Sequence, residues 1–163
     1  MAQLKQMINK NKFYIIGTLI LFLFLFYCST KLCMNVAPDE YMRYDIPLFI
    51  YNYSYLPKGD EKEILNAIWG FSYGFTPYLP SIISFFFMKI ASIFTTAPVH
   101  LLIAARLTSV LAGALTFFVC CKIGEEIFNH KMTIYLFAIF VSLLPQFMYV
   151  SLYLNNDSFS IFT

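Results

Sequence analysis

Two acidic motifs in this 163-residue chain contain residues that could do chemistry. The first is the adjacent pair Asp39 and Glu40, which follows a long apolar run, and the second is Asp157, which follows another. Paired carboxylates from separate segments can provide a general base or hold a divalent metal ion. Acidic side chains near membrane depth are costly and often functional. Asp39, Glu40 and Asp157 are therefore candidate catalytic residues, and candidate ligands if a metal is bound.

Each acidic motif also has a purely structural interpretation. Asp39 is placed to cap a helix from Glu40 to Ile50, in which Glu40 suits the helix dipole and Arg43 is an i+3 or i+4 partner. Asp157 can cap the apolar helix that follows it. The two interpretations are compatible, because a capped helix start would also fix a catalytic carboxylate.

Two arginines are candidates for binding a phosphate group. Arg43 lies beside the first acidic motif, and Arg106 lies near the end of a later apolar run. A guanidinium can hold phosphate through two parallel hydrogen bonds. The alternative for Arg106 is that it snorkels to the membrane surface or pairs with an acid of a loop. The sequence has no glycine-rich phosphate loop, nucleophile elbow or H-E-x-x-H motif, so nothing in it indicates soluble nucleotide chemistry.

The composition is that of a membrane protein. Hydrophobic residues make up 60% of the chain and charged residues 12%, with a mean hydropathy of +0.68. So short a chain cannot bury that much apolar surface in a core of its own, which makes lipid the expected solvent. The net charge of +2 forms no basic stripe, which argues against nucleic acid as a partner. The four cysteines have no C-x-x-C spacing and are interpreted as small apolar residues.

The apolar runs predict an all-α membrane protein with three transmembrane helices and an outer juxtamembrane helix. Three lysines precede the first run, and residues 34–76 contain six acids against three bases, so the positive-inside rule places the N-terminus in the cytoplasm. The first run is long for a signal peptide and no small-residue cleavage site follows it, which favours an uncleaved anchor. The predicted order is a cytoplasmic basic tail (1–12), a first span (13–33), an outer loop with juxtamembrane helices (34–98), a second span (99–121), a cytoplasmic loop (122–131), a third span (132–154), and an outer turn with the start of a truncated fourth span (155–163).

Residues 78–94 decide on which side of the membrane the second acidic motif lies. The segment is apolar and aromatic, but it starts among prolines and contains Lys89. If it spans, the lysines of residues 122–131 face outside and Asp157 faces the cytoplasm, against the positive-inside rule. If it lies in the outer interface with Lys89 snorkelling to the headgroups, Asp157 emerges on the same face as Asp39. The sequence favours this second arrangement.

At these residues the chain resembles the N-terminal part of bacterial integral-membrane glycosyltransferases of the GT-C fold, related to protein O-mannosyltransferases and lipid A aminoarabinose transferases. The resemblance covers nearly the whole chain and is carried by the order of five stretches: APDEYMRYDIPLFI, LPKGD, WGFSYGFTPYLPSIISFFFMKI, LLIAARLTSVLAG and PQFMYVSLYLNNDSFSIF. It implies an enzyme of the bacterial cytoplasmic membrane that takes a sugar from a polyprenyl-phosphate carrier at the outer face. It also implies that Asp39 and Glu40 form the acidic motif of the first outer loop, and that Asp157 is the second acid.

The chain also departs from that family, whose members have more spans and a later outer part that completes the site. By itself we expect it to be inactive and to need the remainder of a truncated chain. In the complete enzyme Asp39 would take the acceptor proton, and Arg43, Arg106 or a divalent metal would stabilise the departing phosphate. The sugar, the acceptor and the need for a metal stay open.

Two other functions compete with this one. The first is a noncatalytic small membrane subunit or assembly factor, whose aromatic outer loop would bind a partner or a lipid. The second is a transporter fragment, which is less favoured because the charges gather at one face and not at the membrane midplane.

The predicted orientation can be tested by cysteine accessibility. In a background without the native cysteines, we expect Asp157→Cys to react with an impermeant thiol reagent from outside and Glu126→Cys to be protected. Labelling of position 126 from outside, together with protection of position 157, would show that the orientation is wrong.

Overall fold

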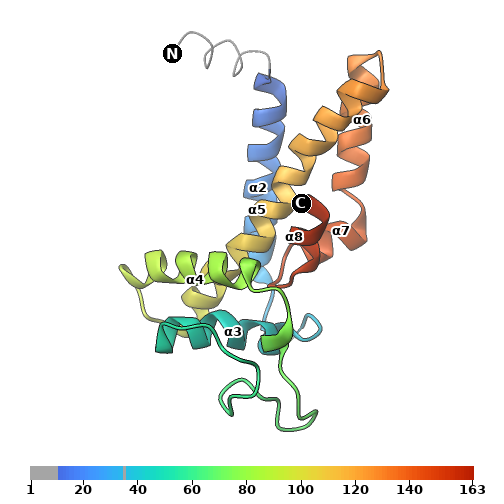
Figure 1. The fold of residues 1–163 in the computed structure, drawn as a ribbon. Coiled ribbons are helices and arrows are strands. Elements are labelled where there is room, and N and C mark those ends of the chain that lie inside the picture. Colours follow the sequence, from blue (N-terminus) through green and yellow to red (C-terminus); the bar gives the residue numbers. More distant parts are fainter. Residues whose placement is uncertain (1–10, 35) are drawn as a thin grey trace.

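The computed structural model describes residues 11–34 and 36–163, and over that range the chain is helical with no strand. Figure 1 shows an upright group of helices standing on a layer of two transverse ones. The helices are α2 (Lys12–Lys31), α3 (Glu40–Tyr53), α4 (Leu79–Ser92), α5 (Pro98–Ile127), α6 (Lys131–Ser142), α7 (Pro145–Val150) and α8 (Asp157–Phe162), with a 3₁₀ turn η1 at Tyr73–Phe75. The all-helical prediction is confirmed.

Helix α5 is the centre of the structure. It packs against α2, α4, α6 and α8, and most of its residues are buried. Its buried face is rich in small residues, which let neighbouring backbones approach closely. At Gly113 an added Cβ would lie 2.6 Å from Cβ of Ser151, so the turn after α7 rests directly on the α5 backbone.

Two helices of the described residues, α2 and α5, are long and apolar enough to cross a membrane. They run in opposite directions, because the start of α2 meets the end of α5. Lys122 Nζ donates to Asn11 Oδ1 at 2.6 Å, and the Tyr14 hydroxyl donates to Glu125 Oε1 at 3.0 Å. The segment that joins α5 to α6 therefore lies at the same end of the bundle as Asn11.

The third predicted span is not one helix. Residues 132–154 were expected to cross the membrane, but α6 ends at Ser142, and its 12 residues rise only about 18 Å against a hydrocarbon core of about 30 Å. Pro145 explains the break, since the residue before a proline is biased away from the helical region, and Leu144 is extended with ψ 124°. Helix α5 continues to Ile127, beyond residue 121 where the second span is predicted to end, so residues 128–130 connect α5 to α6.

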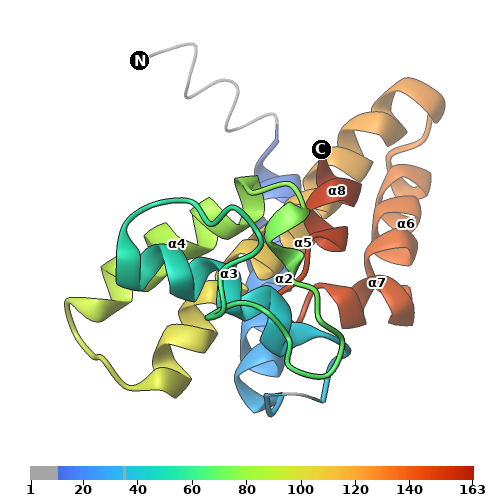
Figure 2. The same ribbon diagram turned by 60° about the horizontal axis from the view of Figure 1, so that its bottom comes forward.

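Helices α3 and α4 form the transverse layer. They lie beside each other across the end of the bundle at which α2 terminates, as Figures 1 and 2 both show. Ser84 anchors α4 to α5: its Oγ donates to the Ala105 carbonyl at 3.0 Å and lies 2.8 Å from Thr108 Oγ1. Lys89 Nζ lies 4.7 Å from the centre of the Tyr51 ring on α3. The segment 79–92 thus runs across α2 and α5 and not alongside them.

The close contact at Gly113 predicts a large effect of a small substitution. Gly113→Ala should destabilise the protein by about 1–3 kcal/mol, because the added methyl group must displace Ser151 from a packed turn. Thermal unfolding in detergent, monitored by the fraction of protein that stays monodisperse, measures this loss of stability. Leu115→Ala on the exposed side of α5 is the control, and equal midpoints for the two variants would contradict the predicted packing.

Candidate functional site

A buried ion pair lies behind the first acidic motif. Arg106 of α5 donates from Nε to Glu40 Oε1 at 2.6 Å and from Nη2 to Glu40 Oε2 at 2.7 Å, which is a bidentate arrangement. Both side chains are removed from solvent, with exposed fractions of 1% for Arg106 and 0% for Glu40. Arg106 Nη1 also donates to the carbonyls of Ser29 and Leu32 at the end of α2, at 2.8 and 2.7 Å. The guanidinium is therefore committed to partners within the chain.

This pairing changes what two of the predicted site residues can do. From the sequence, Glu40 is predicted to act in catalysis and Arg106 to bind phosphate. Glu40 Oε1 also accepts the Leu154 backbone N–H at 3.0 Å, so this carboxylate faces the interior and not a substrate. The alternative considered for Arg106, pairing with an acid of a loop, is the arrangement observed.

Asp39 lies beside this pair but faces outward. It is exposed, and its backbone has φ 56°, in the left-handed region that aspartate tolerates better than most residues. Its side chain makes no capping hydrogen bond to α3, so the predicted cap was wrong. Its Oδ2 instead accepts the Tyr73 hydroxyl at 2.9 Å, because the left-handed turn directs the carboxylate away from the helix start and toward η1.

Arg43 lies one turn along α3 and does not pair with Asp39 or Glu40 as expected. Its guanidinium carbon lies 4.6 Å from the centre of the Tyr73 ring, a cation–π contact. Its buried Nε has no hydrogen-bond partner among the described residues. Burial raises the pKa of Tyr73 and the hydrogen bond to Asp39 raises it further, whereas Arg43 lowers it. The net shift is upward, so the phenol keeps its proton.

The second acidic motif is brought to the same region. Asp157 is exposed at the first position of α8 and does not cap that helix: Asn155 Oδ1 accepts the backbone N–H groups of Asp157 and Ser158, at 2.7 and 3.1 Å. The pKa of Tyr153 is raised, first by burial and then by the charge of Asp157, whereas the charge of Arg43 lowers it. Tyr153 is thus within electrostatic range of both the second acid and the arginine beside the first.

The loop that carries Tyr73 is held by its own hydrogen bonds. Glu61 accepts the backbone N–H groups of Lys58 and Gly59, at 2.7 and 2.9 Å, and Ser72 Oγ donates to the Gly59 carbonyl at 2.6 Å. The sequence analysis did not single out Tyr73 or Tyr153. The one signal for Tyr73 was its place in an aromatic stretch punctuated by glycine.

The carboxylates do not form a metal site. In residues 11–34 and 36–163, no group of three or more histidines, cysteines, aspartates or glutamates is arranged to hold a metal ion. Of the three candidate carboxylates, Glu40 is paired with Arg106, and Asp39 and Asp157 are exposed. The residues present therefore do not fit the divalent metal considered from the sequence.

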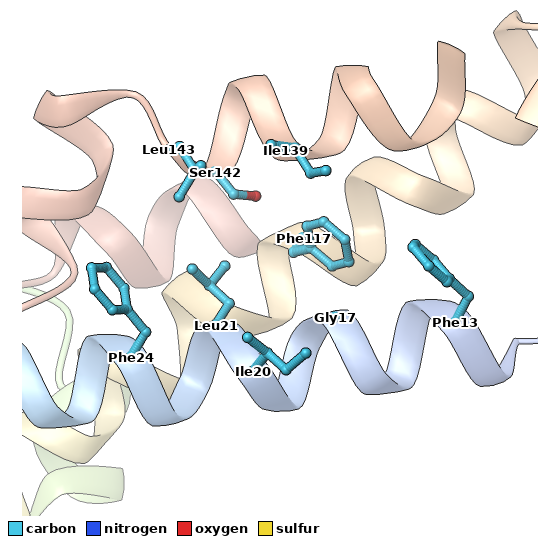
Figure 3. Close-up of a pocket in the computed structure, with 9 residues that line it drawn as sticks. All are labelled: Phe13, Gly17, Ile20, Leu21, Phe24, Phe117, Ile139, Ser142 and Leu143. Carbon is cyan, nitrogen blue, oxygen red and sulfur yellow. The ribbon is translucent and has the colours of Figure 1, made fainter. Parts of the chain in front are cut away.

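Two cavities border α2. A space of about 380 Å³ opens between the end of α2 and the start of α5; Lys31 and Arg106 line it together with apolar residues. A second, of about 360 Å³, lies between α2 and α6 over Phe117 (Figure 3). Its lining is apolar apart from Ser142, and it includes none of the predicted site residues.

Comparison with protein-family models, curated proteins and solved structures gives no match for this chain.

One acid outside the predicted site gives a pH-dependent prediction. Burial on α3 raises the pKa of Asp45 to about 6, so the folded state favours the protonated form. This contribution to the free energy of unfolding is present below about pH 4 and is lost as the pH rises through 6. Asp45→Asn should therefore stabilise the protein by about 1–3 kcal/mol at pH 7.5 and have no effect near pH 3.5.

Thermal melts across this pH range measure the effect, with Asp60→Asn at an exposed position as the matched control. A stabilisation by Asp45→Asn that is the same at both pH values, or that Asp60→Asn reproduces, would contradict the assignment to burial.

Proposed function

We propose that this chain is part of a membrane glycosyltransferase that moves a sugar from a polyprenyl-phosphate carrier to an acceptor at the outer face of the bacterial cytoplasmic membrane. The observation that carries the proposal is the outward-facing carboxylate of Asp39, held by Tyr73, with Arg43 over the same ring. This is the acidic motif to which the resemblance to the GT-C glycosyltransferases assigns catalysis.

The proposed reaction uses these residues in distinct roles. Asp39 takes the proton of the acceptor hydroxyl while that oxygen attacks the anomeric carbon of the sugar. The bond between that carbon and the phosphate oxygen breaks, and the electron pair leaves with the polyprenyl phosphate. Arg43 supplies positive charge that stabilises that leaving group. A positioned base contributes roughly 10²- to 10⁴-fold to such a reaction.

The membrane setting agrees with the distribution of charge and hydropathy. α2 and α5 have the length and apolar character of spanning helices, and α2 exposes a large apolar surface. Lys12, Lys122 and Lys131 lie at the end of the bundle opposite Asp39, which favours a cytoplasmic position for that end. α4 would then lie in the outer interface with lipid as its neighbour.

A second candidate function, a noncatalytic subunit, has its own supporting observation. The outer loop exposes Ile68, Trp69 and Phe75 by 82%, 68% and 73%, which is unusual for large apolar side chains in water and favours contact with a partner. A subunit of this kind would not need the carboxylate of Asp39.

Substitution of Asp39 separates the two functions. In membranes that contain the complete protein, Asp39→Asn should lower the transfer of labelled sugar from a polyprenyl-phosphate hexose by at least about 100-fold, because it removes the base and keeps the shape. Asp157→Asn tests the second acid in the same way. Glu126→Gln, an exposed acid at the other end of α5, is the control.

Near-wild-type transfer by Asp39→Asn at equal protein level would remove Asp39 from the mechanism. Absence of transfer by the wild-type protein across a panel of polyprenyl-phosphate hexoses, together with capture of a partner through the exposed loop, would favour the noncatalytic subunit.

A further inference from the structure

One oxygen atom links the two acidic motifs. Glu40 Oε1 accepts both Arg106 Nε–H and the backbone N–H of Leu154, at 2.6 and 3.0 Å. Glu40 directly follows Asp39 in the chain, and Leu154 precedes Asp157 by three residues. We infer that Glu40 is a positioning residue, which sets the separation of Asp39 and Asp157, and that Arg106 holds Glu40 in place. The inference rests on the proposed function for its catalytic consequence but not for its geometry.

Each acidic motif is also bonded to its own surroundings, so Glu40 joins two ordered segments. On one side, Asp39 has a left-handed backbone and is bonded to Tyr73. On the other side, the Asn155 backbone N–H donates to Ser109 Oγ of α5 at 3.3 Å, and the Asn155 side chain holds the first N–H groups of α8. The Leu154 N–H is the point at which the second side meets Glu40.

Stability alone is a poor reason for this arrangement. Burying an ion pair costs about as much in desolvation as the attraction returns, and well-packed apolar residues often stabilise a core as well. An apolar pair, however, could not accept the Leu154 N–H. The carboxylate performs a task that packing cannot perform, because it directs one oxygen at a backbone donor of another segment.

Arg106 is suited to the supporting role. Its planar fork engages both oxygens of Glu40, which fixes the plane of the carboxylate, and its remaining bonds tie it to the end of α2. The guanidinium thereby joins α2, α3 and α5 at the point where the second acidic segment docks. It acts through Glu40 and needs no contact with a substrate.

A shortened carboxylate tests the link. Glu40→Asp keeps the charge that Arg106 needs but is one methylene too short to reach both Arg106 and Leu154. We expect the protein to fold, the backbone amides of residues 153–156 to exchange hydrogen at least about 10-fold faster, and sugar transfer to fall by at least about 10-fold. Hydrogen exchange is measured by mass spectrometry on the complete protein in nanodiscs.

Glu125→Asp is the matched control. Glu125 is also a partly buried carboxylate bonded to side chains, Tyr14 and Lys122, but at the other end of α5. The Glu125→Asp variant should have lower thermal stability, with no change in hydrogen exchange at residues 153–156 or in sugar transfer. Leu154→Pro removes the donor and leaves the ion pair intact, so it should reproduce the loss of transfer caused by Glu40→Asp.

The outcomes separate the inference from the proposed function. Unchanged exchange at 153–156 in Glu40→Asp would overturn the positioning role, and so would a loss of transfer no larger than that of Glu125→Asp. A loss of folded protein in both Glu40→Asp and Leu154→Pro would assign the contact to stability and also overturn it. Faster exchange in a protein whose wild type transfers no sugar would support the link and refute the proposed function.

Discussion

The desolvated pair of Glu40 and Arg106 constrains the rest of the structure, because neither charge can be buried without the other. Loss of one partner leaves a bare charge in the interior, which costs about 3–5 kcal/mol. The pair therefore forces the start of α3, the end of α2 and the N-terminal third of α5 to meet at one point. The turn before α8 joins them through the Leu154 N–H. Four segments, drawn from residues 29–40, the N-terminal third of α5 and the turn before α8, are held together by one ion pair and its hydrogen bonds.

The two layers of the fold follow different packing rules. In the upright bundle, small residues of α5 allow close approach of backbones, as at Gly113, and polar side chains join α5 to α2 at the end near Asn11. In the transverse layer, side-chain hydrogen bonds hold the loop between α3 and η1 together and join Tyr73 to Asp39, which suits a surface in contact with water. The exposed acids lie where these two layers meet, so their position depends on both.

The separation of roles between Asp39 and Glu40 is the main functional consequence of this arrangement. Two adjacent carboxylates have opposite environments, because the left-handed residue at 39 turns one outward and the helix start turns the other inward. Asp39 keeps a free oxygen beside Tyr73 and Arg43. Glu40 is fully buried and binds Arg106 in the interior. A pair that the sequence presents as one site is thus one candidate base and one internal support.

The sequence determined the helical class, the two long apolar helices and the gathering of acids at one end, because hydropathy and charge are local properties that survive in any packing. It also contains Pro145, which breaks the helix of the third apolar run through local sterics. The length of that run nevertheless led to the prediction of one continuous span. Only the tertiary structure decided which acid is exposed, what Arg106 binds and that Tyr73 holds Asp39. Those outcomes depend on contacts between residues 34 to 114 positions apart, and no local pattern specifies them.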